Sequence, residues 1–263
     1  MIRLCVAGAT GRMGGTLIQE AVSRGFEIVG VIAALDDPKQ NRTLRELGLC
    51  NSDLRVVDPS RLEEAAHEAD VYVSFTSPEA ELSNIPAVAS IGKRIAMGTT
   101  GLTNDQMEQL RAVVSSKVPA VFAPNFAIGV NILFKILKSL KSLPKDYDIS
   151  IVEAHHSGKK DAPSGTAVSM AKQISEMRGY ETTVHGRSGL SLRKPSEIEV
   201  VAIRAGGIPG IHRVIAAGPY EMLSIEHLSF SRSVFAQGAL YAAEWLMKQT
   251  NPGVYSLDDV LSS

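Results

Sequence analysis

The stretch Ile2-Arg-Leu-Cys-Val-Ala-Gly8-Ala-Thr-Gly-Arg-Met-Gly14 decides how the first half of this 263-residue chain is expected to fold. Residues 2–7 are nearly all apolar, which is typical of a strand buried on both faces. Glycines spaced three residues apart follow, and a helical pattern then leads to a second apolar strand at Phe26 to Ala33. Strand, glycine turn, helix and strand in this order predict a βαβ unit.

The same alternation continues to residue 126, with short loops between the segments. Repeated strands and helices of this kind form parallel sheets, so the pattern predicts a doubly wound Rossmann sheet. The helix expected from Thr103 has Gln106 placed for a capping box. The other expected strands are Leu54–Val57, Val71–Phe75, Arg94–Met97 and Pro119–Ala123, and the other expected helices are Pro59–Glu68 and Glu79–Ile91.

A different pattern begins after residue 127. One amphipathic helix is expected from Gly129 to Leu143, and another from Ser164, after a strand at Tyr147–Ala154. Further strand-like runs then follow, and the turns between them are too short for crossover helices, which indicates an antiparallel or mixed sheet. These runs are Ile198–Arg204, Ile211–Ala217 and Met222–Ser229.

We therefore expect an α/β protein with two domains. Residues 1–127 would form a dinucleotide-binding domain with a parallel sheet. A final helix, expected from Val234 to Gln249 in the segment 234–263, would pack back on that domain. Residues 128–233 would form an α+β domain with a mixed sheet, which we expect to bind the substrate.

The composition argues against several classes of function. The 27 basic and 28 acidic residues leave a net charge of −1, which predicts neither nucleic-acid nor membrane binding. No apolar run reaches the length of a membrane span, and the N-terminus lacks the order of a signal peptide. Two cysteines are too few for a disulfide framework, so a cytoplasmic location is expected. Neither metal-ligand spacing nor the Gly-x-Ser-x-Gly elbow of hydrolases is found.

The turn from Gly8 to Gly14 predicts a dinucleotide site. Glycines let the backbone approach a pyrophosphate, and the helix that follows directs N–H groups and its positive end at the phosphates. In such sheets ligands bind beyond the carboxyl ends of the strands, where Gly98-Thr-Thr-Gly101 and Ala123-Pro-Asn-Phe126 lie. Phe126 could pack on a nicotinamide ring and Asn125 could bond its amide. Turn chemistry, a helix cap and a core aromatic are the structural alternatives.

At the adenosine end of this site the sequence offers two alternatives. An acidic residue is expected where the second strand ends, but the chain there is Ala33-Ala-Leu-Asp-Asp37. Asp36 or Asp37 could reach the ribose, or both could be ordinary loop residues. Arg12, Lys39 and Arg42 could instead meet a 2′-phosphate. The choice between NAD and NADP therefore stays open.

A second site is predicted at Glu153-Ala-His-His-Ser-Gly-Lys-Lys-Asp-Ala-Pro-Ser-Gly-Thr166. The loop combines protonatable groups, positive charge and the start of a helix, which favours an anionic substrate that needs a proton. His155 and His156 follow a strand and point to opposite faces, so one can meet the ligand while the other bonds the loop. Histidine suits proton transfer because its ordinary pKa is about 6.5.

The rest of this loop divides in the same way. Lys159 is the candidate for an active-site cation, whereas Lys160 is expected in solvent. Ser164-Gly165-Thr166 can cap the helix, and it can also present N–H groups and a hydroxyl to a carboxylate. A side chain at Gly165 would crowd such a ligand.

These residues resemble the dihydrodipicolinate reductase family, and the resemblance covers nearly the whole chain. The pattern Glu153-Ala-His-His-x-x-Lys-x-Asp-Ala-Pro-Ser-Gly-Thr166 is its most specific part. Further motifs follow in the family's order. They are Gly8-Ala-Thr-Gly-Arg-Met-Gly14, Phe75-Thr, Gly98-Thr-Thr-Gly101, Asn125-Phe-x-x-Gly-Val-Asn131, Arg204-Ala-Gly and Ser231-Arg232…Phe235-Ala-x-Gly-Ala239.

The resemblance implies a function and a set of roles. The reaction would be the reduction of 4-hydroxy-tetrahydrodipicolinate to tetrahydrodipicolinate in lysine and diaminopimelate synthesis, with NADH or NADPH. His155 would be the general acid or base and Lys159 a second proton donor. His156, Gly165 and Thr166 would bind carboxylates, and the second domain's sheet would build a homotetramer. The cofactor would be held by Gly8, Ala9, Thr10, Gly11, Arg12, Met13, Gly98, Thr99, Thr100, Ala123, Pro124, Asn125 and Phe126, to which we add Asp36.

The sequence also departs from the family's pattern. Ala34 stands where the ribose acid is usual, so the cofactor preference is not transferred. Ile211 and Arg213 stand where the family usually has an acid and a threonine. Two other functions are considered: a different two-domain dehydrogenase acting on an amino-acid-derived carbonyl, and a catalytically silent dinucleotide-binding regulator. The joint presence of His155 and Lys159 disfavours the regulator.

Overall fold

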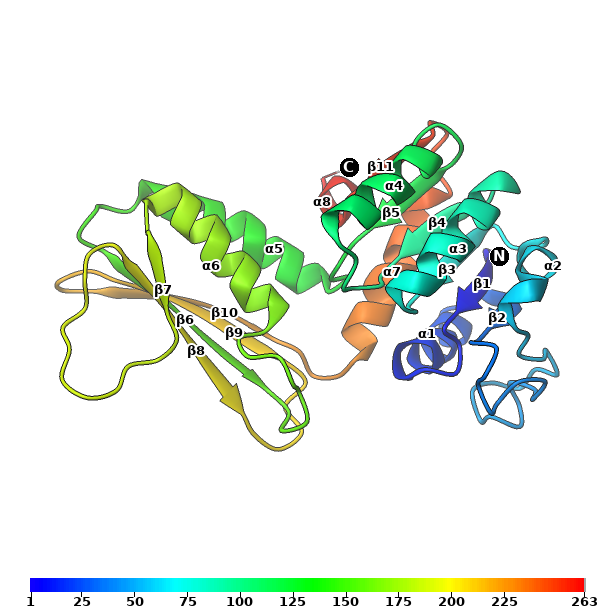
Figure 1. Ribbon diagram of the computed structural model, residues 1–263, viewed down its shortest axis with the longest axis horizontal. Helices are drawn as coiled ribbons and strands as arrows, with labels where there is room; N and C mark the ends of the chain where they lie inside the picture. Colours follow the sequence, from blue (N-terminus) through cyan, green and yellow to red (C-terminus); the bar gives the residue numbers. More distant parts are fainter. Residues whose placement is uncertain (263) are drawn as a thin grey trace. The chain divides into compact units, whose positions relative to one another are not determined.

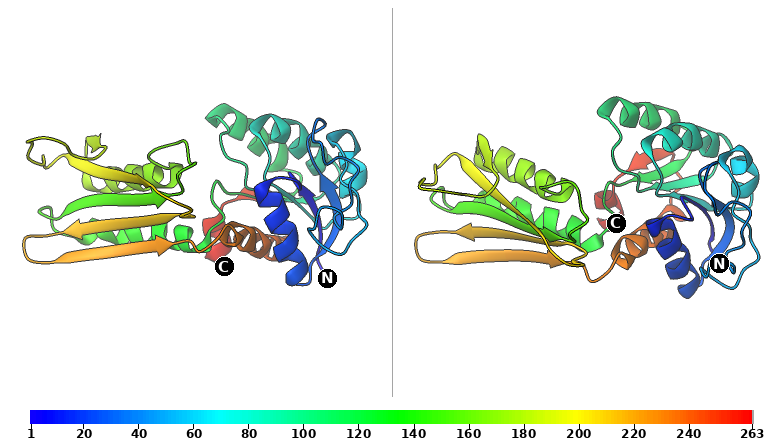
Figure 2. Two further views of the ribbon diagram at one scale, coloured as in Figure 1. Left: turned by 90° about the horizontal axis from the view of Figure 1, so that it is seen from below. Right: turned by 60° about the horizontal axis from the view of Figure 1, so that its bottom comes forward.

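The computed structural model describes residues 1–262, and the chain divides into two compact units. The first unit comprises Met1–Ile128 and Arg232–Ser263, and the second comprises Gly129–Ser231. Each unit has its own sheet and its own covering helices (Figures 1 and 2). The two are therefore described separately.

The first unit is a doubly wound parallel sheet with the strand order β11-β5-β4-β3-β1-β2. All its strand pairs are parallel, which confirms the predicted Rossmann sheet. Its strands are β1 (Arg3–Ala7), β2 (Glu27–Ile32), β3 (Val71–Ser74), β4 (Arg94–Met97), β5 (Pro119–Phe122) and β11 (Gly253–Tyr255). Its helices are α1 (Arg12–Ser23), α2 (Leu62–Ala66) after the 3₁₀ turn η1 (Pro59–Arg61), α3 (Pro78–Ser90), α4 (Asn104–Val114), α7 (Ser233–Leu246) and α8 (Leu257–Leu261).

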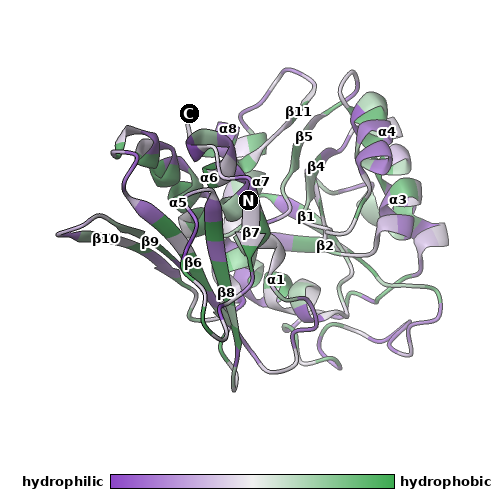
Figure 3. Ribbon diagram, turned by 60° about the vertical axis from the view of Figure 1, so that its left-hand side comes forward, coloured by the Kyte–Doolittle hydropathy of each residue, from purple (hydrophilic) through white to green (hydrophobic). Residues whose placement is uncertain are grey.

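Both faces of this sheet are covered, because successive side chains on a strand point to opposite sides. On β1, Leu4 and Val6 belong to the core beneath α1 and α7, whereas Cys5 and Ala7 belong to the core beneath α2, α3 and α4. Burial raises the pKa of Cys5 to about 12, so this thiol acts as a small apolar side chain. In Figure 3, polar and apolar residues are mixed along α3 and α4, as expected of helices with one buried face.

The second unit is a mixed sheet with the strand order β10-β9-β6-β8-β7. Strand β6 is parallel to β8 and antiparallel to β9, so it lies between two strands that follow it in sequence. Helices α5 and α6 lie on the same face of this sheet in Figures 1 and 2. The elements are α5 (Ile128–Leu137), the 3₁₀ turn η2 (Lys138–Ser142), β6 (Asp148–His155), α6 (Gly165–Arg178), β7 (Thr182–Val184), β8 (Glu197–Arg204), β9 (Ile211–Ala217) and β10 (Met222–Leu228).

The structure corrects three expected elements. Leu54–Val57 is not a strand, because it forms only isolated bridges, including Ile32 with Val57. The helix expected from Gly129 to Leu143 is α-helical only to Leu137 and then tightens into η2, as helix ends commonly do. The last expected helix ends at Leu246. Beyond it the N–H groups of Lys248 and Gln249 bond carbonyls three residues back, as in the tightened last turn of a helix, and the chain then forms β11 beside β5.

Candidate active site

Strand register gathers four polar side chains on the helix-covered face of the second sheet. Glu153 and His155 are two residues apart on β6 and therefore share a face. His212 on β9 is paired with Glu153, and Arg204 on β8 is paired with His155. The antiparallel and the parallel neighbour of β6 thus each contribute one residue beside the predicted histidine.

Glu153 is the centre of this cluster. It is fully buried, and its two carboxylate oxygens accept four hydrogen bonds. Arg204 donates two of them, at 3.0 and 2.8 Å, His155 Nδ1 lies at 2.5 Å, and the Ser164 N–H lies at 3.1 Å. Burial raises the pKa of Glu153, but the bonds from Arg204, His155 and Ser164 together outweigh it and hold the pKa below its ordinary value. Glu153 is therefore a carboxylate at neutral pH.

The ring of His155 is oriented by that carboxylate. Because an ionised carboxylate only accepts, His155 Nδ1 must carry the hydrogen, and Nε2 is left for other chemistry. A Cβ atom at Gly210 would lie 3.3 Å from Nε2, so glycine there keeps the space beside this nitrogen open. Burial lowers the pKa of His155 below 6.5, and the hydrogen bond and charge of Glu153 offset part of that effect.

His212 supports this arrangement as a neutral ring. Its Nε2 lies 3.1 Å from Ser164 Oγ, and its ring meets that of His155 edge-on with 5.2 Å between centroids. Burial, followed by the charge of His155, lowers the pKa of His212 to about 4. The Oγ of Ser164 also accepts from the Ala167 N–H at 3.3 Å and caps α6. The cap of α6 and the histidine pair therefore share one hydroxyl.

The loop after β6 carries the remaining predicted residues. Lys159 is partly buried, and its Nζ lies 2.8 Å from Asp161 Oδ1. Lys160 is exposed, as expected, whereas His156 is half-buried and its carbonyl accepts from the Lys159 N–H at 3.1 Å. Arg204 holds the far side of this loop by donating to the Asp161 carbonyl at 2.5 Å.

Gly165 and Thr166 form the first residues of α6 and follow the cap Ser164. Gly165 is exposed, and a Cβ atom there would meet no described atom within 4 Å. Protein packing therefore does not require glycine at 165.

The glycine turn of the first unit has the close contacts that its spacing predicts. A Cβ at Gly14 would lie 2.1 Å from the carbonyl oxygen of Gly8, so helix α1 can begin here only without a side chain. Gly8 has φ +75° and packs its Cα against the carbonyl of Phe75. Gly11 is the N-cap of α1 and has no side chain with which to cap the helix. The N–H groups of this helix start are suited to an anion. Arg12 is exposed and Met13 is half-buried.

The adenosine end lies beside this turn. A cavity of about 220 Å³ is lined by Ala9, Thr10, Gly11, Gly15, Lys39, Arg42, Glu46, Leu47 and Leu49. Asp37, rather than the predicted Asp36, contacts the turn, because its Oδ2 accepts from Thr10 Oγ1 at 2.5 Å. Lys39 Nζ donates to the Thr10 carbonyl at 3.0 Å. Asp36 is exposed and does not line the cavity.

The other expected cofactor loops follow β4 and β5. Phe126 is only 1% exposed and packs edge-on against Phe75, with 5.9 Å between ring centroids. Its ring therefore belongs to the core, and only its backbone remains a candidate for cofactor contact. Asn125 Oδ1 accepts from the Ala127 N–H at 2.9 Å. A Cβ at Gly98 would lie 2.2 Å from the Phe75 ring. Thr99 and Ala123 are buried, whereas Thr100 and Pro124 are exposed.

Sequence reasoning gave no role to Glu153, Arg204 or His212. Glu153 and His155 stand two residues apart in a strand, so their shared face was a usable signal. Arg204 lies 51 residues from Glu153, and His212 lies 48 residues from Ser164. These two depend on strand pairing, which no local pattern reveals.

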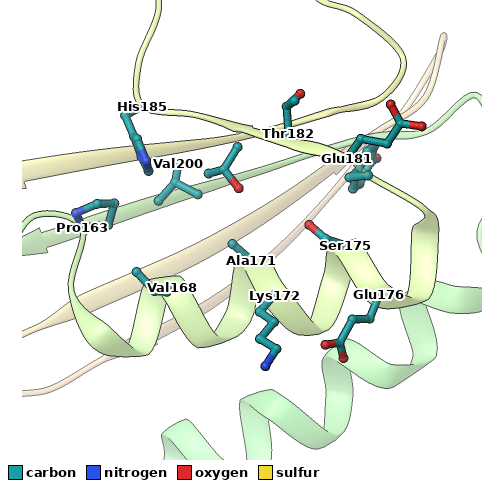
Figure 4. A pocket seen from close by; sticks show the side chains of 12 residues that line it. Pro163, Val168, Ala171, Lys172, Ser175, Glu176, Glu181, Thr182, His185 and Val200 are labelled. Carbon is teal, nitrogen blue, oxygen red and sulfur yellow. The ribbon is translucent and has the colours of Figure 1, made fainter. Parts of the chain in front are cut away.

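A separate cavity of about 510 Å³ lies between α6 and the strands β7 and β8 (Figure 4). Its lining includes Lys172, Glu176 and His185, but none of the predicted site residues. Among residues 1–262, no group of three or more His, Cys, Asp or Glu side chains is arranged for a metal ion. Within the same residues, no helix has the length and apolarity required to cross a membrane.

The geometry predicts how Glu153→Gln changes the titration of His155. Loss of the carboxylate removes the interaction that raises the pKa of His155 and leaves Arg204 unneutralised beside it, so this pKa should fall further. The lowered pKa of Glu153 also stabilises the wild-type fold above its unfolded pKa of about 4.3, and that contribution is lost as pH falls through the folded pKa. The free energy of unfolding of the variant should therefore fall less steeply as the pH is lowered through this range.

NMR titration of the histidine ring protons measures the first effect, and denaturant unfolding at several pH values measures the second. Glu226→Gln is a matched control, because Glu226 pairs with Arg213 on the exposed part of the sheet. An unchanged or higher pKa of His155 in Glu153→Gln would contradict this reading of the cluster.

Comparison with known proteins identifies the family. The profile described as dihydrodipicolinate reductase, N-terminus, matches residues 2–126, and that described as dihydrodipicolinate reductase, C-terminus, matches residues 129–261. Proteins named 4-hydroxy-tetrahydrodipicolinate reductase from Methanosarcina barkeri (strain Fusaro) and Methanothermobacter thermautotrophicus (strain Delta H) are each 41% identical to this chain. Each alignment covers 99% of both proteins.

Solved structures show the same fold. Dipicolinate-bound dihydrodipicolinate reductase from Paenisporosarcina sp. TG-14 matches with a TM-score of 0.76 and 24% identity, over 97% of each chain. An amine dehydrogenase from Mycobacterium smegmatis matches with a TM-score of 0.67 and 15% identity, over 98% of this chain and 95% of that one. Together, the two profiles and the full-length relatives show that this chain belongs to the dihydrodipicolinate reductase family, whose members are oxidoreductases that use a pyridine nucleotide.

Proposed function

We propose that the protein reduces 4-hydroxy-tetrahydrodipicolinate to tetrahydrodipicolinate with NADH or NADPH, as a cytoplasmic step of lysine and diaminopimelate synthesis. The observation that carries this proposal is the buried Glu153 carboxylate, which holds His155 Nδ1 and a helix start by direct hydrogen bonds. A catalytically silent regulator would have no use for an oriented histidine with an open Nε2. A different carbonyl-reducing dehydrogenase remains the second candidate, and the substrate assay below separates the two.

The substrate half of the proposed site lies in the second unit. A cyclic dicarboxylate carries two negative charges, and the N-terminus of α6 with Gly165 and Thr166 offers N–H groups and a hydroxyl to one carboxylate. Lys159 offers a cation once its Asp161 partner is exchanged for the substrate, and His156 lies in the same loop. The negative substrate would also raise the pKa of His155, because opposite charge favours the imidazolium.

In the proposed mechanism, His155 is the general acid. Loss of water from the 4-hydroxy compound gives a cyclic imine. NADH or NADPH, when held by the first unit, would supply the hydride for ring carbon C4. His155 gives the proton from Nε2 to the adjacent carbon, while Glu153 keeps hold of Nδ1 and stabilises the positive ring. Lys159 balances developing negative charge and is the second group in the loop that can supply this one proton. The glycine turn of the first unit suits the pyrophosphate, since it packs tightly at the start of α1, where the N–H groups and the positive end of the helix dipole favour an anion.

The test follows loss of the near-ultraviolet absorbance of NADH and of NADPH with freshly made 4-hydroxy-tetrahydrodipicolinate. We expect oxidation by the wild type, and His155→Gln should lower kcat by about 10²–10⁴-fold with nucleotide binding retained. Glutamine is polar and of similar length but cannot deliver a proton. Absence of oxidation with both nucleotides would refute the proposed reaction. Loss of nucleotide binding by a folded His155→Gln protein would assign the histidine a different role.

Gly165→Ala separates ligand binding from folding. The added methyl group meets no described protein atom within 4 Å, and alanine favours a helix over glycine by about 1 kcal/mol. The unfolding temperature should therefore stay equal or rise, while KM for the dicarboxylate rises about tenfold because the methyl group occupies the space of a carboxylate. Steady-state kinetics and thermal unfolding measure the two effects. A variant with unchanged KM would remove Gly165 from the proposed site.

We further propose that NADPH is preferred over NADH. The end of β2 has Ala33 and Ala34 where a carboxylate that selects a free 2′-hydroxyl is usual. The nearby Asp37 carboxylate already accepts hydrogen bonds from Thr10 Oγ1 at 2.5 Å and from the Lys39 N–H at 2.8 Å. Lys39 and Arg42 both line the cavity beside the glycine turn, and each offers a cation to a phosphate. Glu46 lines it too, but its carboxylate is already bonded to the Thr43 N–H at 2.7 Å.

Lys39→Ala should raise KM for NADPH by about tenfold and change KM for NADH little, because a charge-assisted bond to the 2′-phosphate is lost. Arg45→Ala is the matched control, since Arg45 pairs with Asp53 at 3.3 Å and does not line the cavity. Steady-state kinetics with each nucleotide provides the measurement. Equal changes for both nucleotides would place Lys39 at the pyrophosphate or in the loop structure instead.

The homotetramer implied by the resemblance is also part of this proposal. The face of the second sheet away from α5 and α6 carries one row of apolar side chains, in which Ile203 is paired with Ala154 and Leu228 with Ile211. Ile203 and Leu228 are each 43% exposed. Apolar side chains left open on a sheet face favour association. Sedimentation analysis would distinguish a tetramer from a single chain.

A further inference from the structure

The first unit contains a buried acidic side chain, Glu81, that has no part in the proposed mechanism. It lies beneath the loops that follow β3 and β4. Glu81 is in the first turns of α3 and is fully buried. Burial raises the pKa of Glu81, against the lowering effect of hydrogen bonds from Thr76 and Thr99. Burying such a group costs free energy, which calls for a specific reason for its presence.

The hydrogen bonds of Glu81 join two loops that follow neighbouring strands. Its Oε1 accepts from Thr76 Oγ1 at 2.6 Å, after β3, and from Thr99 Oγ1 at 2.5 Å, after β4. Thr99 Oγ1 in turn accepts from the Thr76 N–H at 2.8 Å. Two hydroxyls, one amide and one carboxyl oxygen therefore form a closed network that bridges residues 76 and 99.

The same network borders the backbone expected to meet the nicotinamide. Residues 98–100 were assigned to the cofactor, and Gly98 lies directly against the ring of Phe75, the neighbour of Thr76. Thr99 is buried, so its hydroxyl serves the protein, while Gly98 and Thr100 on either side of it remain accessible. A displacement of Thr99 would therefore also move the backbone of Gly98 and Thr100.

Two further polar side chains lie near Glu81. The hydroxyls of Tyr72 and Ser74 lie near enough to interact electrostatically with Glu81. Neither hydroxyl, nor Glu81 Oε2, makes a hydrogen bond of ordinary geometry within residues 1–262. Both hydroxyls come from β3, the strand that leads into the Thr76 loop. A glutamine at 81 could therefore keep the bonds from both threonines through its oxygen and offer its N–H groups to these hydroxyls.

We propose that Glu81 is a positioning residue for the nucleotide, which ties the loop after β3 to the loop after β4 and thereby sets the backbone at the nicotinamide end. The inference rests on the proposed function in one respect, namely that residues 98–100 contact the cofactor. Glu81 itself does not touch the nucleotide. Its effect passes through Thr76 and Thr99.

The experiment compares Glu81→Gln and Glu81→Leu by direct NADPH binding and by steady-state kinetics. Glu81→Leu should raise the dissociation constant and KM for NADPH by about tenfold, while KM for the dicarboxylate changes less than twofold, because only the cofactor loops lose their connection. Glu81→Gln should restore NADPH binding to within about twofold of the wild type. Ile85→Ala is the matched control, since Ile85 is fully buried one turn further along α3 and makes none of these hydrogen bonds.

The outcomes separate the possible explanations. If Ile85→Ala, at equal loss of thermal stability, weakens NADPH binding as much as Glu81→Leu, the role of Glu81 is structural only and the proposal is overturned. Unchanged NADPH binding by folded Glu81→Leu overturns it as well. A wild-type protein that binds NADPH but does not reduce the dicarboxylate would refute the proposed reaction and leave this test of Glu81 intact.

Discussion

The ionised carboxylate of Glu153 is the constraint around which the second unit is built. A charge removed from water costs several kcal/mol unless it is paired and hydrogen-bonded, and here four donors from three elements meet that need. Arg204 comes from β8, His155 from β6 itself, and Ser164 from the start of α6. Removing one partner would leave a buried charge uncompensated, at a cost of about 3–5 kcal/mol. Strand pairing, helix placement and histidine orientation are thus coupled through one group.

This coupling explains how a loop can carry a precise site. Ser164 uses its N–H for Glu153 and its Oγ for both the cap of α6 and His212. The helix start that is proposed to bind a carboxylate is therefore held relative to the histidine that is proposed to give the proton. Arg204 also bonds the Asp161 carbonyl and restrains the segment that contains Lys159. Because the loop is already restrained, ligand binding loses less conformational entropy in ordering it.

Local patterns predicted much of the fold, because they act over a few residues. The capping box of Thr103 and Gln106 is present as expected, and the glycine turn opens α1. Leu54–Val57 had the composition of a strand, but composition cannot tell whether a neighbouring strand is available for pairing. The return of the chain as β11 could not be predicted for the same reason, since its partner β5 lies more than a hundred residues earlier.

In the candidate site, too, local sequence predicts some residues, whereas others depend on strand pairing. Its loop, from Glu153 to Thr166, could be predicted because residue types with matching chemistry stand close together in sequence. Arg204 and His212 could not, because they reach the loop only through the register of β6 with β8 and β9. A one-residue slip of either pairing would turn its side chain to the opposite face. The apolar residues that align these strands are therefore indirect determinants of the site.

The glycines show why similar motifs need separate physical explanations. An added Cβ at Gly14 would lie 2.1 Å from a backbone oxygen, and one at Gly98 would lie 2.2 Å from the Phe75 ring, which would have to move. Gly165 faces open space, although it too stands at a helix start in a predicted binding loop. For the first two, the fold alone requires glycine, so their presence says little about a ligand. For Gly165 the fold makes no such demand, so only a ligand of the kind proposed above would require glycine there.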